Sequence, residues 1–337
     1  MAVTALLLGI AVLFFLCLLT GSVSIPAADV WAALTGGQVK PVWQFIVVES
    51  RLPQALAAIF CGASLASSGL LLQAIFHNPL ADTSVLGISS GASLGVALVT
   101  LATGGGLWVL SGSFGGFALT MVAALLGALA VTAVMLQLAS QIRSGALVLI
   151  VGIMVGYVAS SVVMILSALA TEDGLRSFLV WGMGSFSGVT REHLLPFLAL
   201  QLAGMGGMLA LAKQLNVWML GPQYAESLGL RTRRLRLLVL AIVGLLAAVT
   251  TAYCGPVAFL GLAVPHIARM LCATDDHRVL LPLTMLAGAL VALACNLMCS
   301  LPFGGSILPL NAITPIVGAP VVVGVIMKKN QSLNPNL

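Results

Sequence analysis

Long apolar runs, cut by short clusters of charged and turn-forming residues, follow one another along the entire chain. A helix needs about 20 consecutive apolar residues to cross the hydrocarbon core of a bilayer. The pattern therefore predicts ten membrane-spanning helices, of which the eighth is short and interrupted by Pro265. The predicted spans cover residues 3–20, 52–75, 84–103, 117–139, 146–169, 194–212, 237–253, 257–271, 280–300 and 309–327.

Composition agrees with this pattern. Of the 337 residues, 60% are hydrophobic and 7% are charged, whereas water-soluble domains carry about 25% charged residues. The first apolar run lacks a basic n-region and is longer than the apolar part of a signal peptide, so we keep it as a span. We expect an all-α, polytopic membrane protein in which residues 1–337 form a single domain.

The distribution of basic residues predicts the orientation. With the N-terminus inside, ten of the fourteen Lys and Arg residues fall in inner loops and the C-terminal tail, and cytoplasmic loops carry such an excess. We therefore expect both termini in the cytoplasm. The net charge of +5 is spread over loops beside spans without interleaved aromatic residues, so it gives no sign of a nucleic-acid partner.

Two energy sources can be weighed from the sequence. An ion-coupled carrier needs ionisable groups at bilayer depth, and the middle of every predicted span lacks Asp, Glu, Lys and Arg. The chain also lacks a Gly-x-x-x-x-Gly-Lys-Ser/Thr phosphate-binding loop. If ATP drives this protein, another subunit must hydrolyse it.

His266 is the one titratable side chain that we place inside a span. It follows Pro265, whose ring frees backbone carbonyls for other donors, so a structural hydrogen bond is favoured over a proton relay or an intramembrane active site. Cys295 and Cys299 lie one helical turn apart but have no neighbouring His or acid. We therefore predict no metal site and no catalytic residue.

A polar turn, His-Asn-Pro-Leu-Ala-Asp-Thr-Ser, separates the second and third spans. Because Pro79 leaves backbone groups that hydrocarbon cannot satisfy, the turn must face water or protein. Glycines then recur at four-residue spacing, which places small residues on one helix face and allows close packing. These glycines are Gly87, Gly91 and Gly95, followed further along by Gly152 and Gly156.

Residues 213–236 form the longest non-spanning stretch on the predicted inner side. Gly221 and Pro222 predict the start of a short helix and Gly229 predicts its end. Helical spacing brings Tyr224, Ala225 and Leu228 to one side, followed by four arginines. A helix of about two turns is unstable alone, so the segment is either a docking element for a soluble partner or an ordinary loop helix.

Five blocks of sequence resemble the FecCD-type permeases, the membrane subunits of bacterial ABC importers for cobalamin, haem and ferric siderophores. They are RLPQALAAIFCGASLASSGLLLQAIFHNPLADTSVLGISSGASLG from Arg51, LNVWMLGPQYAESLGL from Leu215, GPVAFLGLAVPHIARML from Gly255, DHRVLLP from Asp276 and LPLNAITPIVGAP from Leu308. The resemblance covers nearly the whole chain and implies a ten-span permease fold.

The resemblance also implies partners. Permeases of this family pair as dimers around a central path, bind two ATPase subunits below, and receive cargo above from a periplasmic or lipid-anchored binding protein. Such a chain lies in the bacterial inner membrane among its lipids and binds no cofactor itself, because ATP and Mg are held by the partner subunits. A second copy of this chain is the expected dimer partner.

Family roles carry over to particular residues of this sequence. The Asn-Pro-Leu turn and the loop before the fifth span form the inner gate in the family. Asn78 and Leu80, with Ser144 and Gly145, are the residues at those positions. The segment before the seventh span couples the permease to the ATPase, and its contact positions are Leu220, Gly221, Ala225, Leu228 and Gly229.

Some family positions differ in this chain. Relatives often carry two arginines around the first Leu-Pro, which dock the binding protein; Arg51 is kept, but Gln54 replaces the second. Another outer arginine position holds Ser300, and an outer glutamate position holds Ile307. Only Arg51 is therefore expected to dock the binding protein in the family manner, and Arg176 and Arg191 are the possible substitutes.

The sequence thus predicts the permease half of an ATP-driven importer for an iron chelate, haem or cobalamin, and not an enzyme. An ion-coupled secondary transporter is the first alternative, and the missing intramembrane carboxylates disfavour it. A membrane enzyme centred on His266 is the second. The residues do not distinguish among the cargoes.

Overall fold

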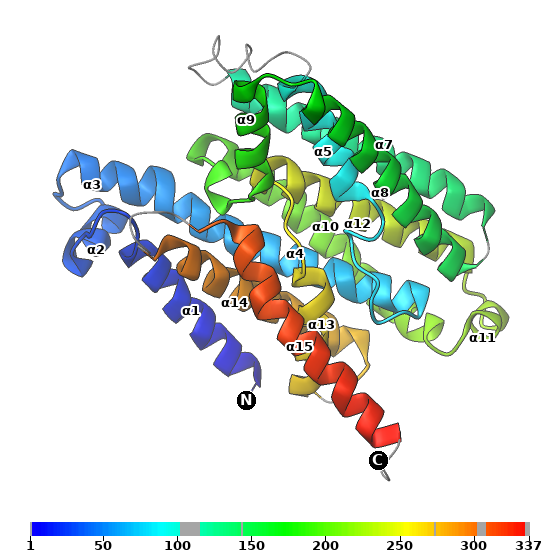
Figure 1. Cartoon of the computed structure of the whole chain (residues 1–337). Coiled ribbons are helices and arrows are strands. Elements are labelled where there is room, and N and C mark those ends of the chain that lie inside the picture. The colour runs from blue at the N-terminus through cyan, green and yellow to red at the C-terminus, as the bar shows by residue number, and fades with distance from the viewer. Residues whose placement is uncertain (1, 102–114, 143, 273, 302–307, 334–337) are drawn as a thin grey trace.

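The computed structural model of the chain describes residues 2–101, 115–142, 144–272, 274–301 and 308–333, and these form helices joined by turns and loops (Figure 1). The α-helices are α1 (Ala2–Leu19), α2 (Ala27–Thr35), α3 (Pro41–Phe45), α4 (Leu52–Phe76), α5 (Ile88–Thr100), α7 (Gly115–Gln141), α8 (Gly145–Ala168), α9 (Glu172–Gly182), α10 (Arg191–Trp218), α11 (Pro222–Ser227), α12 (Thr232–Cys254), α13 (Leu260–Cys272), α14 (His277–Ser300) and α15 (Leu310–Leu333). A π-helical segment, Ile46–Arg51, joins α3 to α4, and a 3-10 turn, Phe186–Gly188, precedes α10.

Each of the ten predicted spans corresponds to one of these helices. Seven helical segments are long and apolar enough to cross a membrane, and three further apolar helices, Ile88–Thr100, Leu260–Cys272 and Leu310–Gly324, are shorter. The eighth predicted span is α13, which has 13 residues and contains Pro265. The all-α, polytopic fold expected from the sequence is confirmed.

α4 lies in the middle of the bundle, with α1, α14 and α15 on one side and α5, α7 and α8 on the other (Figure 1). It packs directly against α14, α13, α10 and α12. Every residue from 61 to 76 is buried. The helix that runs through the core therefore delivers the Asn-Pro-Leu turn to one end of the bundle.

Small residues let the backbones around α4 approach closely. A Cβ atom added at Gly62 would collide with the backbone carbonyl of Gly288 on α14, and one added at Gly69 would collide with the backbone of Gly261 on α13. Close backbone approach of this kind holds membrane helices together where lipid supplies no hydrophobic force between them. α4, α13 and α14 form one tightly packed unit.

The glycines after the turn divide their contacts between two helices. Gly91 and Gly95 lie against α7, where a Cβ would meet the carbonyls of Gly127 and Ala123. Gly87 precedes α5 with φ +74 and lies against Gly152 and Gly156 of α8. The prediction that three glycines share one face of a helix is therefore wrong for Gly87, because the turn unwinds the chain until Ile88.

The first helix begins, and the last helix ends, on the side of the bundle that carries α11 (Figure 1). An even number of crossings requires this arrangement. The end of α4 points to the same side (Figure 1). We call this the α11 end of the bundle, and the end that carries α2, α3 and α9 the opposite end.

Candidate functional site

The Asn-Pro-Leu turn begins where α4 stops. His77 takes a left-handed backbone conformation, φ 48, and ends the helix. The Asn78 side chain then accepts a hydrogen bond from the backbone N–H of Leu80 at 2.9 Å, which closes a tight turn around Pro79. Leu80 projects outward with 48% of its surface exposed. The turn is thus a defined structure with an apolar side chain at its tip.

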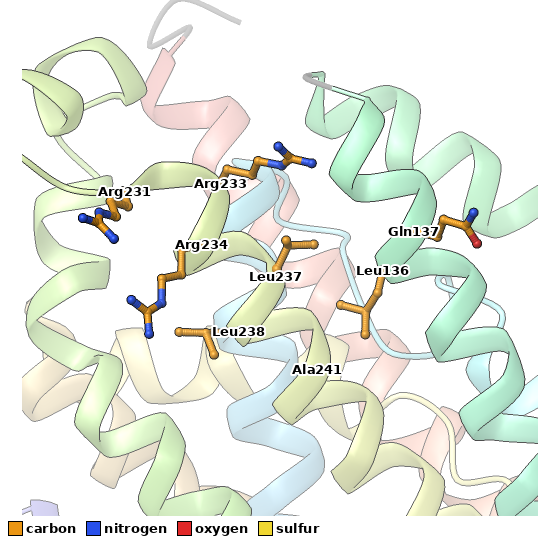
Figure 2. Close-up of a pocket in the computed structure, with 8 residues that line it drawn as sticks. All are labelled: Leu136, Gln137, Arg231, Arg233, Arg234, Leu237, Leu238 and Ala241. Carbon is orange, nitrogen blue, oxygen red and sulfur yellow. The ribbon is translucent and has the colours of Figure 1, made fainter.

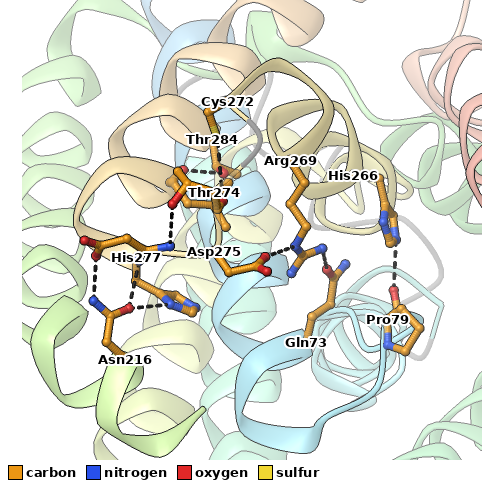
Figure 3. A network of polar contacts seen from close by, with 12 residues as sticks. Gln73, Pro79, Asn216, His266, Arg269, Cys272, Thr274, Asp275, His277 and Thr284 are labelled. Atoms are coloured by element: carbon orange, nitrogen blue, oxygen red, sulfur yellow. Dashed lines mark hydrogen bonds and ion pairs between the residues drawn. The ribbon is translucent and has the colours of Figure 1, made fainter. Parts of the chain in front are cut away.

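His266 of α13 holds this turn in place. Its Nε2 atom lies 3.2 Å from the carbonyl oxygen of Pro79 (Figure 3). The ring is buried, with 8% of the residue exposed. The contact is the structural hydrogen bond to a backbone carbonyl that the sequence favoured for His266, although the carbonyl belongs to the turn and not to the proline-broken helix itself.

Gln73, one turn before the end of α4, makes a second link to α13. Its Nε2 donates to the carbonyl oxygens of Gly261 and Leu262, at 3.4 Å each, and its Oε1 accepts from Arg269 at 2.8 Å (Figure 3). Arg269 also pairs with the exposed Asp275, 3.9 Å away. Backbone and side-chain contacts therefore fix the end of α4 to α13 on both sides of the turn.

Asp82 is a functional candidate that the sequence reasoning missed. Its carboxylate is buried, with 4% of the residue exposed, and it accepts from the hydroxyls of Thr83 at 3.4 Å and Ser84 at 3.0 Å. It lies against Gly261 of α13, where a Cβ would collide with it. Burial raises the pKa of Asp82 above its usual range. An acid followed directly by two hydroxyl residues was the available signal.

The start of α8 lies beside the end of α4. Ser144 caps α8, and its hydroxyl accepts from the backbone N–H of Leu147 at 3.5 Å. A Cβ on Gly145 would stand 3.2 Å from the ring of Phe76, the last residue of α4. The two sequence segments assigned to the inner gate are therefore adjacent in the fold. Gly145 contacts Phe76, and the described part of the chain shows no hydrogen bond between the two segments.

The short helix predicted in residues 213–236 is α11. Gly221 precedes it with φ +107 and Gly229 follows it with φ +82, so both glycines occupy backbone conformations that other residues rarely adopt. The side-chain pattern differs from the expectation. Ala225 is fully buried within the chain, while Leu220, Tyr224 and Leu228 are 61%, 57% and 58% exposed. Ala225 therefore supports α11 from inside and does not reach a partner.

Arg51 has a structural role that excludes it from the exposed surface. It is 7% exposed. Its guanidinium donates to the carbonyl oxygen of Leu18 at 2.8 Å, to that of Leu19 at 3.0 Å, and to that of Val23. The carbonyls of Leu18 and Leu19 are ones that the end of α1 leaves without helical partners, and Val23 lies in the segment that follows. The expectation that Arg51 docks a binding protein is therefore not supported, because the side chain points into its own chain.

The neighbouring positions that depart from the family pattern line one cavity at the opposite end. Gln54 donates to the side-chain oxygen of Asn296 at 2.9 Å. Both line a cavity of about 470 Å³, together with Arg51 and Ser300. Ile307 lies outside the described residues. A polar but uncharged pair thus lines this cavity beside Arg51.

The two substitute arginines differ in availability. Arg191 forms an ion pair with Glu49 at 2.6 Å, so its charge is already compensated. Arg176 is exposed on α9 and borders a separate cavity of about 340 Å³. Of these two, Arg176 has the charge that a partner could reach.

Polar side chains also gather where α14 begins. Asp276 caps the helix by accepting from the backbone N–H of Arg278 at 2.9 Å, and it accepts from Asn216 at 2.5 Å; these bonds lower the pKa of its carboxyl. Asn216 in turn accepts from the backbone N–H of His277 at 2.8 Å (Figure 3). Within the described ranges, no group of three or more His, Cys, Asp or Glu residues could hold a metal ion. The cluster caps a helix.

Comparison with known proteins gives the family. The model of the FecCD transport family matches residues 8–328. The vitamin B12 import system permease protein BtuC of Klebsiella pneumoniae subsp. pneumoniae is 34% identical over 318 residues, which cover 94% of this chain and 92% of that protein. The same protein of Escherichia coli O127:H6 is 34% identical over 324 residues, with 96% and 94% covered.

A solved structure is similar along nearly the full length. It shows a metal-chelate type ABC transporter in an inward-facing conformation, and it matches with a TM-score of 0.82 and 28% sequence identity. The match covers 96% of this chain and 98% of that one. Together with the order of helices and the turn at the end of α4, these likenesses identify an ABC transporter permease. The chain belongs to the FecCD transport family.

Proposed function

We propose that this permease moves a bulky metal chelate, of the corrinoid, haem or iron-siderophore kind, from the periplasm into the cytoplasm by alternating access. Two relatives are named for vitamin B12 import and one similar structure for metal-chelate transport. A corrinoid is itself a metal chelate, so these names agree on the chemical class.

The observation that carries this proposal is the construction of the turn after α4. Pro79 is held by His266, and Gln73 is held by the backbone and Arg269 of α13, so turn, α4 and α13 move together. The start of α8 touches them through Gly145. Asn78 and Leu80 then form one side of an inner gate, and Ser144 and Gly145 form the other. Opening would separate the start of α8 from the end of α4, including the contact between Gly145 and Phe76.

Energy for opening comes, in this proposal, from two ATPase subunits that hold ATP and Mg. This chain binds no cofactor. The ATPases dock on the exposed face of α11, made of Leu220, Tyr224 and Leu228, while Gly221 and Gly229 set its ends. An apolar face on a helix too short to stand alone is suited to a groove in a soluble partner.

The remaining partners follow from the orientation. The α11 end faces the cytoplasm of a bacterial cell, with both termini inside, and the opposite end meets a periplasmic or lipid-anchored binding protein near Arg176. A second copy of the chain packs against α8, whose exposed apolar residues include Met154, Tyr157, Val158 and Ile165. Lipid surrounds the dimer.

Transport in proteoliposomes tests the proposal. The chain, purified with the ATPase subunit of its operon and reconstituted, is expected to import radiolabelled cobalamin, haem or a ferric siderophore when binding protein and ATP are supplied. A proton ionophore should leave the rate unchanged. Uptake that needs a proton gradient and continues without ATP would overturn the proposal.

The coupling face has its own test. Leu228→Asp places a charge in a packed contact, so we expect the ATPase subunit to co-purify at least about tenfold less. Leu169→Asp, at an 80% exposed position at the opposite end of α8, is the control. Ala225 is a poor test site because a large side chain there would disturb α11 itself. Equal co-purification of the parent chain and the Leu228 variant would remove α11 as the docking face.

One observation favours the alternative of an ion-coupled carrier: the buried carboxyl of Asp82 beside the turn. A proton-coupled cycle would have to load and unload this group. Asp82→Asn cannot carry a proton, so ATP-driven uptake that survives this substitution excludes the alternative, and gradient-driven uptake that disappears with it supports the alternative.

A further inference from the structure

A groove runs between α7 and α12 at the α11 end of the bundle. It has a volume of about 750 Å³. Figure 2 shows Leu237 of α12 and Leu136 of α7 between the two helices, with Arg233 at the upper end. The lining consists of Leu136, Gln137, Leu237, Leu238 and Ala241, together with Arg231, Arg233 and Arg234. Arg231 and Arg234 point to the side of α12 that faces away from Leu136 (Figure 2). The groove is apolar along its length and basic at its mouth.

The three arginines at the mouth are not used by the fold. In the described part of the chain, no ion pair or hydrogen bond involves the side chain of Arg231, Arg233 or Arg234. The nearby acid Glu226 accepts instead from the hydroxyl of Thr232 at 2.7 Å. Three exposed positive charges within four residues repel one another, so a bound anion would relieve this repulsion.

Arg236 shows by contrast what a structural arginine in this segment looks like. It is buried, and it donates to the carbonyl oxygen of Ala139 and, at 2.6 Å, to that of Ile142. These bonds tie the end of α7 to α12. They use the carbonyls that the last turn of α7 leaves open. One arginine therefore builds the wall of the groove, and the other three remain available to a ligand.

The surroundings of the groove indicate where that ligand comes from. Leu238 is 40% exposed beside the groove, and further along α7 Val134 and Leu126 are 44% and 62% exposed. Both helices are apolar enough to cross a membrane, so these side chains lie at hydrocarbon depth. Arg231 to Arg234 stand at the start of α12 and therefore at the depth of lipid headgroups.

We propose that this groove binds an anionic phospholipid, with its phosphate on Arg233 and one acyl chain along Leu136, Leu237 and Ala241, while the positive charge of Arg234 adds to the attraction. Basic residues beside a gap between membrane helices suit a phosphate headgroup, and the arginine side chain binds phosphate through two parallel hydrogen bonds. The acyl chain fills an apolar groove that water would otherwise enter.

Such a lipid would act on the segment between α10 and α12. α11 and the arginines belong to one stretch of chain, residues 222–234. Neutralising the arginines would remove their mutual repulsion, and the acyl chain would bridge α7 and α12. The bound phospholipid is thus expected to stabilise the region from which α11 projects. The proposed lipid site lies on the outer surface of the chain and does not depend on which cargo is transported.

Native mass spectrometry and thermal unfolding of the full-length chain in detergent test the site. Phosphatidylglycerol and cardiolipin are the probes, phosphatidylcholine is the uncharged comparison, and glycerol 3-phosphate supplies the headgroup chemistry without a chain. We expect anionic lipid to remain bound and to raise the unfolding temperature. Phosphatidylcholine and glycerol 3-phosphate should produce neither effect.

Two variants remove the two halves of the site. Arg233→Gln combined with Arg234→Gln should weaken phosphatidylglycerol binding on the order of tenfold, since each surface arginine attracts anionic lipid. Ala241→Phe keeps every charge but fills the groove, and it should weaken binding as well. Arg278→Gln removes an exposed arginine that lies outside the groove, at the start of α14, and should change nothing.

The outcomes separate the possibilities. Equal binding by the parent chain, the double arginine variant and the Ala241 variant would overturn the proposal. Loss of ATPase co-purification in the arginine variant, with lipid binding intact, would assign the charges to the soluble partner instead. A change from dimer to monomer in the Ala241 variant, with lipid binding intact, would assign the groove to a second copy of the chain.

Discussion

α4 and α8 are both long apolar helices, yet only one is buried by its own chain. Within the most apolar 18 residues of each span, 83% are buried in the segment that contains α4 and 28% in α8. α8 is nevertheless the more hydrophobic, with a mean hydropathy of 2.5 against 1.9. Hydropathy thus marks which helices cross the membrane, and it does not rank their burial, because lipid is as apolar as a protein core.

The residues that distinguish the two helices are the small ones. α4 reads CGASLASSG over residues 61–69, a fully buried run in which every residue except Leu65 is small. α8 instead presents large apolar residues outward, among them Met154, Val158 and Met164. Small side chains permit the backbone contacts of α4 with α13 and α14. Large ones on α8 remain available to lipid or to a second copy.

The largest expected effect tests the tight packing of α4. Gly69→Ala drives a Cβ into the backbone of Gly261, which cannot move as a flexible side chain could, so we expect a loss of about 3 kcal/mol or more of stability. Gly206→Ala on α10 is the control, because no atom lies within 4 Å of an added Cβ there. Thermal unfolding in detergent, followed by a dye that reacts with the buried cysteines, measures both. Equal unfolding temperatures would contradict this account of α4.

The next effect tests the free face of α8. Val158→Trp keeps the face apolar but changes its shape at a position that is 66% exposed. We expect the stability of the single chain to be unchanged and dimerisation to weaken by roughly tenfold or more. Leu202→Trp on α10, at a position that is 54% exposed, is the matched control. Mass photometry distinguishes dimer from monomer. A dimer that persists in the Val158 variant would place the interface elsewhere.

A smaller effect tests how firmly the end of α4 is held. His266→Leu removes the donor to the Pro79 carbonyl, which costs about 1–3 kcal/mol when a buried polar group loses its partner. His266→Gln can still donate, and it should recover most of both stability and ATP-driven uptake. Unfolding temperature and uptake rate are measured together. If Gln abolished uptake while the fold and the ATPase association stayed intact, the imidazole would have a chemical role.

The smallest effect is a change of slope with pH. Burial raises the pKa of Asp82 in the folded chain. The unfolded chain loses this proton near the ordinary Asp pKa of about 3.9, whereas the folded chain keeps it to a higher pH. The stability of the folded state therefore falls as the pH rises through the folded-state pKa. Asp82→Asn should remove that fall. Asp276 has a lowered pKa and contributes stability that is lost on acidification, so Asp276→Asn should be destabilising at neutral pH. The unfolding temperatures of the parent chain and of the Asp82 variant are measured between pH 4 and 9. If both fall equally as the pH rises, the raised pKa of Asp82 is contradicted.

Much of the fold was predictable because membrane crossing is a local property. About 20 apolar residues must form a helix in lipid, where every backbone group needs a partner, and all ten predicted spans appear as helices. The ends of α11 were predictable for a similar reason, since Gly221 and Gly229 adopt positive φ values that the sequence marks directly. Neither result depends on the rest of the molecule.

The site was less predictable, and three residues show why. Arg51 looked like a surface charge, but the carbonyls that bind it come from the end of α1 and the segment after it, 28 to 33 residues earlier. Ala225 looked like part of an exposed face, but α11 turns it inward. Asp82 lay in a loop by sequence, and only the approach of α13 buries it. For Arg51 and Asp82 the deciding partner is distant in the chain, and for Ala225 the packing of α11 against α10 and α12 decides.

By itself, the sequence determined that the chain spans a membrane, in which part of the chain each of the ten spans lies, and which family's motifs it carries. These follow from hydropathy, proline and glycine, which act within a few residues. The tertiary structure alone decided which charges are structural and which are free: Arg51 and Arg236 bind carbonyls inside the chain, while Arg176 and Arg233 remain exposed. An arginine is buried or exposed according to whether another helix offers it unpaired carbonyls, and that depends on how the helices pack.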